Sequence, residues 1–249
     1  RGLDIGTAKP TPWQRQAARH HLVDVVGPGE RYSVARWLAD AADAVEDCRG
    51  RGRRILFVGG TPLYLRALRD GIDPLPAGDP ELRRRLEEEL AASGTLPLHD
   101  RLAAVDAAAA ARIHRHDARR IIRALEVATH GGGIAPGSWR GPREATPTFS
   151  ERMMIVDLPR RLLYERIDRR VEEMFAAGLV AEARAAEEAS GGIGPTARQA
   201  AGYAEALEVA AGRIDEAEAV RLTQRRTRQL AKRQLTWLRS FRSAVWITA

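Results

Sequence analysis

The chain has 249 residues, of which 44% are hydrophobic, with a formal net charge of +7 and a single cysteine. One cysteine excludes an intramolecular disulfide, and no apolar run approaches the roughly 18 residues of a membrane span, so we expect a cytoplasmic protein with no membrane partner. The length suits one large domain, or a core domain with a smaller insertion.

The positive charge is concentrated near the C-terminal end of the chain. Residues 219–249 contain eight Lys and Arg side chains and no Asp or Glu, so the positive charge of this segment alone exceeds the net charge of the whole chain. A local excess of this kind favours a polyanionic partner such as a nucleic acid.

The first part of the chain has the pattern of an α/β protein. It begins with "RGLDIGTAKP", a loop whose Asp4, Thr7 and Lys9 have the polar chemistry of a site. Ser33 can cap a helix that ends near Cys48, before two glycines. Short apolar runs predict buried strands at 21–26, 54–60, 152–158 and 244–248. Strand, helix and strand in this order predict a parallel sheet.

A helical insertion is predicted in the middle of the chain. The proline-rich "IDPLPAGDP" interrupts the α/β pattern, and Asp79 with Pro80 then begins a helix. Further helices are predicted at 97–113, 117–130, 160–190, 197–211 and 215–240, with a Gly- and Pro-rich loop at 131–150. We therefore predict a core at 1–73, a helical insertion at 74–150 and a second part of the core, with a basic C-terminal helix, at 151–249.

The turn formed by Gly59, Gly60 and Thr61 lies between a predicted strand and a predicted helix. Backbone N–H groups and the positive end of the helix dipole make such a turn a site for an anion. A plain tight turn with Thr61 as the helix cap explains the same residues equally well. This turn alone does not decide between the two interpretations.

Two arginine-rich helices are candidates for binding a phosphate backbone. Arg119 and Arg123 share a face of the helix predicted at 117–130, with Arg120 beside them, although a solvated face is the commoner case for arginine runs. On the C-terminal helix one stripe contains five cations and no acid lies in the segment, which favours a polyanion over a solvated face. The five are Arg221, Arg225, Arg228, Lys232 and Arg239.

Metal binding is not predicted from the histidines and the cysteine. His20, His21, His114 and His116 lack the spacing and the convergent ligands of a metal site. Cys48 is expected to be a packed residue of the helix that begins after Ser33, because its spacing matches the apolar positions of that helix.

Five blocks of sequence, in their order along the chain, resemble the bacterial tRNA dimethylallyltransferases, also called tRNA isopentenyltransferases. They are "RGLDIGTAKP", "GGTPLYLRAL", "ARRIIRALEV", "QAAGYAEAL" and "TRQLAKRQLTWLR", and the resemblance extends from Arg1 to about Trp246. It implies a core like that of the P-loop nucleotide kinases, a helical insertion and a monomeric enzyme. It also implies transfer of a dimethylallyl group from dimethylallyl diphosphate, with Mg²⁺, to N6 of the adenosine 3′ of the anticodon (position 37).

The resemblance also implies roles for particular residues. Thr61 matches a threonine at the reaction centre, and Arg83 matches a position that contacts tRNA. The remaining positions that match the family's contacts with the tRNA anticodon stem-loop are Arg119, Arg120, Arg123, Gln199, Gly202, Tyr203, Arg228, Lys232, Arg233, Gln234, Trp237 and Arg239.

The chain departs from the family pattern in its phosphate-binding part. No G-x-x-x-x-G-K-[ST] sequence occurs, nor does the "DSMQVY" segment whose aspartate is the family's expected general base. We therefore expect the first strand and the phosphate loop to be absent, the intact parent to be the enzyme, and this polypeptide to bind RNA without transferring the prenyl group. Asp4 is expected to pack the loop rather than to replace the base. Two alternatives are a kinase-like phosphotransferase and an RNA-binding module without activity.

Overall fold

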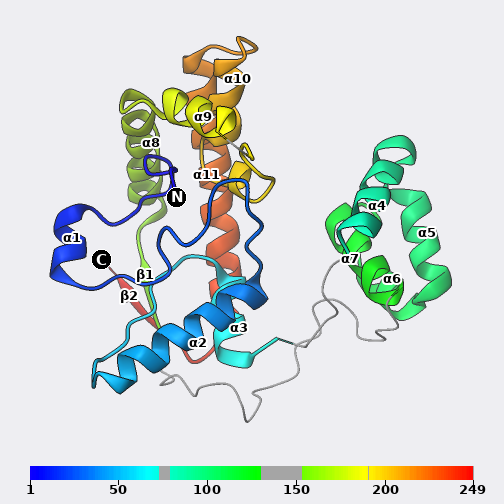
Figure 1. Ribbon diagram of the computed structural model, residues 1–249, viewed down its shortest axis with the longest axis horizontal. Helices are drawn as coiled ribbons and strands as arrows, with labels where there is room; N and C mark the ends of the chain where they lie inside the picture. Colours follow the sequence, from blue (N-terminus) through cyan, green and yellow to red (C-terminus); the bar gives the residue numbers. More distant parts are fainter. Residues whose placement is uncertain (73–78, 130–152, 190, 249) are drawn as a thin grey trace. The chain divides into compact units, whose positions relative to one another are not determined.

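The computed structural model describes residues 1–72, 79–129, 153–189 and 191–248 (Figure 1). The chain forms two compact units, one made of Arg1–Arg69 with Pro147–Ala249 and the other of Asp70–Thr146. Among the described residues, no helix has both the length and the apolar character needed to cross a membrane.

Four helices build the core of the first unit. The long helices α8 (Arg160–Ala176) and α11 (Glu216–Leu238) pack side by side, and α9 (Leu179–Glu188) and α10 (Tyr203–Ala210) lie toward one end of them (Figure 1). The helix predicted at 160–190 is divided because Gly178 adopts a left-handed conformation with φ 95°. The apolar core between these helices includes Val171, Met174, Phe175, Leu179, Ala183, Tyr203, Ala206, Leu207 and Ala219.

The sheet of this unit is small. Strands β1 (Met154–Asp157) and β2 (Val245–Thr248) pair in parallel, with Met154 opposite Val245 and Asp157 opposite Thr248. They confirm the strands predicted at 152–158 and 244–248, as far as the described residues reach. The result is a mostly helical α/β fold with a small parallel sheet.

Two of the predicted strands are wrong. At residues 21–26, Leu22 and Asp24 have φ of 60° and 59°, which takes the backbone out of the β region. Residues 54–60 form no ladder with any described residue, and Leu56 and Val58 are 77% and 87% exposed. An apolar run becomes a strand only when a neighbour accepts its hydrogen bonds, and the local sequence does not supply that neighbour.

The first 70 residues add three helices to the first unit. Helix α1 (Pro12–Ala17) starts with a capping box between Thr11 and Gln14, and α2 (Val34–Gly50) begins where the Ser33 hydroxyl accepts the Arg36 N–H. Helix α3 (Pro62–Asp70) follows the Gly-Gly-Thr turn and contacts α2 through Trp37 and Tyr64, whose ring centroids are 4.8 Å apart.

The described part of the second unit is a cluster of helices: α4 (Pro80–Ser93), α5 (Thr95–Val105), α6 (Ala107–Arg112) and α7 (Ala118–Thr129). Asp79 caps α4 through the N–H groups of Glu81 and Leu82, as the sequence predicts. Leucine and isoleucine side chains fill the centre, among them Leu86, Leu98, Leu102, Ile121 and Leu125. The loop predicted at 131–150 and most of the proline-rich boundary lie outside the described residues.

Candidate functional site

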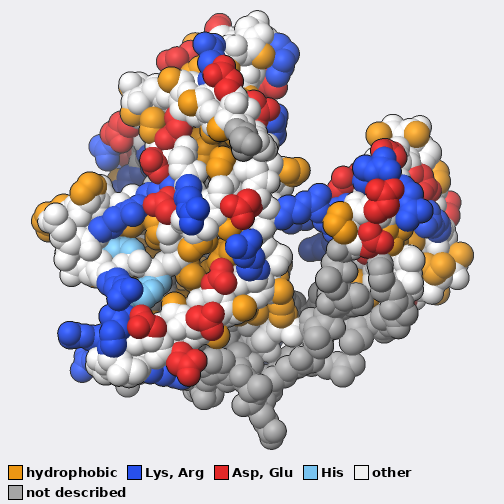
Figure 2. Space-filling model, viewed as in Figure 1, with side chains coloured by type: hydrophobic (Ala, Val, Ile, Leu, Met, Phe, Trp, Pro, Cys, Tyr) orange, Lys and Arg blue, Asp and Glu red, His pale blue; other side chains and the backbone are white. Residues whose placement is uncertain are grey.

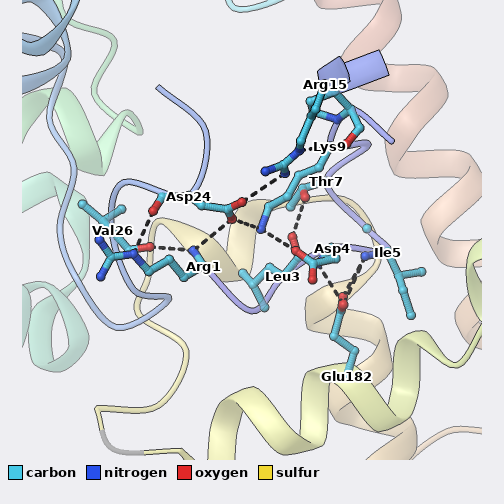
Figure 3. A network of polar contacts seen from close by, with 12 residues as sticks. Arg1, Leu3, Asp4, Ile5, Thr7, Lys9, Arg15, Asp24, Val26 and Glu182 are labelled. Carbon is cyan, nitrogen blue, oxygen red and sulfur yellow. Dashed lines mark hydrogen bonds and ion pairs between the residues drawn. The ribbon is translucent and has the colours of Figure 1, made fainter. Parts of the chain in front are cut away.

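The loop "RGLDIGTAKP" is fixed to the helical core by one carboxylate. Glu182 on α9 accepts the N–H of Asp4 at 2.8 Å and that of Ile5 at 3.1 Å (Figure 3). The buried Tyr203 donates its hydroxyl proton to Glu182 at 2.5 Å and accepts the Gly6 N–H at 3.1 Å. Burial and the bond to Glu182 raise the pKa of Tyr203. The loop is thus held at its backbone, which leaves the Asp4 carboxylate at the surface.

A second set of contacts closes this loop against the segment after α1. The Asp24 carboxylate accepts hydrogen bonds from Lys9 and, at 3.1 Å, from Arg15 (Figure 3). Lys9 also contacts Asp4 at 2.5 Å. The hydrogen bonds from Lys9 and Arg15 lower the pKa of Asp24 to about 2. Lys9 is therefore engaged by two carboxylates, those of Asp4 and Asp24. That Asp4 packs the loop rather than replacing the base stays a prediction.

The Gly-Gly-Thr turn contacts the C-terminal helix. Gln234 of α11 donates its side-chain amide to the Gly60 carbonyl at 2.6 Å, across 174 residues of sequence. Thr61 is exposed at the start of α3, and its carbonyl accepts the N–H groups of Tyr64 and Leu65. Among the described residues, no side chain hydrogen-bonds the Thr61 hydroxyl. The structure therefore places two predicted site residues, Thr61 and Gln234, at one location.

The basic stripe of α11 is partly neutralised, in contrast to the prediction. Arg228 pairs with Asp168 of α8, and Arg221 pairs with Glu218 at 2.5 Å. Both acids lie outside the acid-free segment 219–249: Glu218 comes just before it, and Asp168 lies on the neighbouring helix α8. Lys232 and Arg239 have no acidic partner among the residues that the structure describes.

A surface pocket lies at this unpaired end of the stripe, between α8 and α11. Three cations line it, namely Lys232, Arg239 and Arg160, together with the ring of Tyr164 and with Leu163, Leu235 and Thr236. Within the described part of the chain, none of the three cations has an ion-pair partner. Cations around an aromatic ring are suited to phosphate groups and to a stacked base.

The arginines of the helical unit differ in their availability. Arg83 forms a two-pronged ion pair with Glu126 at 2.6 and 2.7 Å, and Arg123 bonds the same carboxylate at 3.1 Å. Arg120 pairs with Asp117, whereas Arg119 is exposed and has no acidic partner among the described residues. Arg119 and Arg123 therefore do not present a common phosphate-binding face, because the Arg123 guanidinium bonds the buried Glu126.

Comparison with known proteins identifies the family. The model of the family described as IPP transferase matches residues 1–241. A tRNA dimethylallyltransferase of Anaeromyxobacter dehalogenans is 48% identical over 248 residues, which are 99% of this chain and 82% of that protein. The chain belongs to the IPP transferase family.

Solved structures of the family agree with this fold. The full-length tRNA isopentenylpyrophosphate transferase of Bacillus halodurans has a TM-score of 0.67 at 35% identity, covering 100% of this chain and 77% of that one. A eukaryotic dimethylallyltransferase acting on tRNA has a TM-score of 0.68 at 21% identity, covering 96% of this chain and 62% of that one. The α/β fold described above is therefore the fold of the IPP transferases.

Three positions that resemble tRNA contacts of the IPP transferases lie close together near the start of α10. Gln199 is exposed on a short 3-10 turn, while Gly202 and Tyr203 are buried. Gly202 has a left-handed φ of 87°, and a Cβ there would lie 2.6 Å from Leu179 Cδ2, so any other residue would be strained at this position. In this structure Gly202 and Tyr203 hold the fold together, and only Gln199 of the three presents its side chain at the surface.

Two further predicted tRNA contacts lie on α11, and three residues that the sequence did not predict lie on α8 and α9. Arg233 is exposed and Trp237 is half-buried. Sequence reasoning missed Arg160 and Tyr164, which line the pocket, and Glu182, which anchors the N-terminal loop. "PRRLLYER" offers a weak signal, since arginines and a tyrosine follow a strand directly. For Glu182 no sequence signal exists, because its partners are backbone N–H groups 177 and 178 residues away.

The Mg²⁺ implied by the family resemblance has no fitting ligand set in the described residues. Mg²⁺ prefers carboxylates, carbonyls and water in octahedral geometry. The one group of three potential metal ligands found among these residues is His21, Asp47 and Cys48, whose thiol and imidazole suit a softer ion. These three side chains therefore do not fit Mg²⁺.

Proposed function

We propose that the pocket between α8 and α11 binds the backbone of a tRNA anticodon stem-loop beside the turn that carries Thr61. The protein is a tRNA-modifying prenyltransferase of the IPP transferase family. The proposal assigns to Lys232, Arg239 and Arg160 the contacts with phosphate, and to Tyr164 the stacking with a base.

The chemistry explains why an RNA surface must adjoin this turn. A base stacked in the anticodon loop cannot reach a buried donor, so the adenosine has to leave the stack. The N6 amine then attacks the allylic carbon of dimethylallyl diphosphate. A C–N bond forms, the C–O bond to diphosphate breaks with its electron pair, and N6 loses a proton. The positive end of α3, directly after Thr61, favours the charge that develops on the diphosphate.

The observation that carries the proposal is the hydrogen bond from Gln234 to the Gly60 carbonyl at 2.6 Å. It ties the turn before Thr61 to the helix whose next residues, Leu235 and Thr236, line the pocket. RNA held at the pocket is therefore held next to the turn. In the helical unit, Arg119 is the predicted contact that we propose binds the RNA, because it is exposed and has no acidic partner among the described residues.

Binding to a fluorescent anticodon stem-loop, measured by anisotropy at several salt concentrations, tests the proposal. Replacement of both Lys232 and Arg239 by alanine should weaken binding about tenfold and reduce the slope of log affinity against log salt by about 1.5. The control variant replaces Arg161 and Arg221, which are ion-paired with Glu165 and Glu218 and carry the same total charge. Equal losses in the two variants would show that only net charge matters and would refute the pocket.

Transfer is measured with the same RNA and labelled dimethylallyl diphosphate, using a stem-loop with guanosine in place of the adenosine as the control. Label on the adenosine RNA alone would agree with N6 as the acceptor. That these 249 residues bind RNA without transferring the prenyl group stays a prediction, and this assay tests it. Binding that is independent of the pocket, with no transfer, would favour an RNA-binding module of another kind.

A further inference from the structure

The end of helix α2 and the segment after α1 bring a histidine, an aspartate and the single cysteine together. His21 Nε2 lies 3.6 Å from Cys48 Sγ, and the ligand atoms of His21, Asp47 and Cys48 all lie within 4.8 Å of one another. Figure 2 shows histidine side chains reaching the surface of this unit among lysines and arginines. The cluster shares no residue with the pocket between α8 and α11 or with the Gly-Gly-Thr turn.

We propose that His21, Asp47 and Cys48 form a zinc-binding site. Thiolate, imidazole and carboxylate are each ligands that Zn²⁺ accepts, and three protein ligands leave a fourth position to water. Bond lengths of about 2.3 Å to sulfur and about 2.05 Å to nitrogen at a tetrahedral angle place these two atoms about 3.6 Å apart. The distance between Cys48 Sγ and His21 Nε2 has this value without any movement.

The backbone around the cluster orients its side chains. Cys48 and Asp47 lie on the last turn of α2, whose end is fixed by the N–H of Arg53 bonding the Cys48 carbonyl at 2.9 Å. Leu22 has a left-handed φ of 60°, a conformation that is costly for a non-glycine residue. The neighbouring His20 does not join the cluster, because its Nδ1 lies 2.8 Å from the Ala18 carbonyl.

An arginine also contacts two residues of the cluster. Arg51 contacts the Asp47 carboxylate at 2.5 and 3.1 Å, and its Nη2 lies 3.7 Å from Cys48 Sγ. A cation is therefore already attracted to the position between the thiol and the carboxylate. Binding of Zn²⁺ would displace this guanidinium from Asp47 and release the thiol proton of Cys48 to solvent. The ion would then join the segment at residue 21 to the end of α2.

Titration of the metal-free, reduced protein with Co²⁺ alone tests the proposal, because a cobalt–thiolate bond absorbs in the near ultraviolet. We expect the band to saturate at one Co²⁺ per chain and to disappear when Zn²⁺ is added. Cys48→Ser should abolish the band, and His21→Gln and Asp47→Asn should each weaken Co²⁺ binding at least tenfold. Arg51→Ala should strengthen it, since no guanidinium then competes for Asp47.

His20→Gln is the matched control and should bind Co²⁺ like the unaltered chain, with far-ultraviolet circular dichroism checking the fold of each variant. The absence of a thiolate band would overturn the proposal, as would a band that persists in Cys48→Ser or equal losses in His20→Gln and His21→Gln. If Cys48→Ser does not fold, the comparison of the two histidine variants and the gain in Arg51→Ala decide the question. A band that is unchanged or weaker in Arg51→Ala would contradict the assigned position of the ion.

Discussion

Glu126 is the polar residue on which we expect the helical unit to depend most. Its side chain is 1% exposed, and its carboxylate accepts hydrogen bonds from Arg83 of α4 and from Arg123 of α7. The bonds from Arg83 connect α4 to α7, and the bond from Arg123 lies within α7. Glu126→Gln keeps the size of the side chain but removes the charge between the two guanidinium groups.

The expected cost follows from the number and type of these bonds. Removing one partner of a buried ion pair costs about 3–5 kcal/mol, and a hydrogen bond to a charged group contributes about 1.5–3 kcal/mol. The amide of Glu126→Gln keeps one accepting oxygen, so we expect the unit to lose about 2–3 kcal/mol of unfolding free energy. Since Arg83 and Arg123 are only partly exposed, solvent compensates little of this loss.

The same carboxylate gives the unit a pH dependence. Burial by itself would raise the pKa of Glu126, but the hydrogen bonds from Arg83 and Arg123 outweigh it and lower the pKa. A carboxyl group with a lowered pKa in the folded state adds stability above its unfolded-state pKa, and this stability is lost as the pH falls through the folded-state pKa. Acidification to pH values below the ordinary pKa of glutamate should therefore destabilise the unaltered unit. The stability of Glu126→Gln should lack this part of the pH dependence.

Hydrogen exchange followed by mass spectrometry measures the loss locally, in peptides from α4 and α7. A loss of 2–3 kcal/mol corresponds to roughly 30- to 150-fold faster exchange in these peptides where exchange requires the unit to open. The control is Glu88→Gln, which removes an exposed partner of Arg84 on α4 and should leave exchange unchanged. Equal effects of the two substitutions would refute the reasoning, because burial would then not matter.

Two further predictions concern the N-terminal loop. Gly6→Ala places a Cβ 2.4 Å from Tyr203 Cε2, so the loop or the ring has to move. We expect the free energy of unfolding to fall by about 1–3 kcal/mol, which thermal unfolding measures as a lower Tm. An unchanged Tm would contradict the close approach. The hydrogen bonds from Lys9 and Arg15 lower the pKa of Asp24 to about 2. The stability that this network adds should therefore persist at pH values well below the ordinary aspartate range and disappear as the pH falls through about 2. An NMR titration of the Asp24 carboxyl carbon with a midpoint near 4 would contradict this prediction.

The sequence by itself determined those features that depend on neighbouring residues. Ser33 and Asp79 begin helices where the sequence predicts, because a cap bonds N–H groups two or three positions further along the chain. The concentration of positive charge in residues 219–249 is likewise a property of the sequence. The five blocks, in their order along the chain, indicate the family from the sequence alone.

Only the tertiary structure decided which of these groups are available to a partner. Arg228 is paired with Asp168, whereas Lys232 and Arg239 remain at a pocket with Arg160. Strand pairing, ion pairs between helices and the approach of His21 to Cys48 depend on residues that are distant in sequence, and local patterns carry no information on them. Composition therefore indicated a polyanion partner, and folding determined which cations are left without an acidic partner among the described residues.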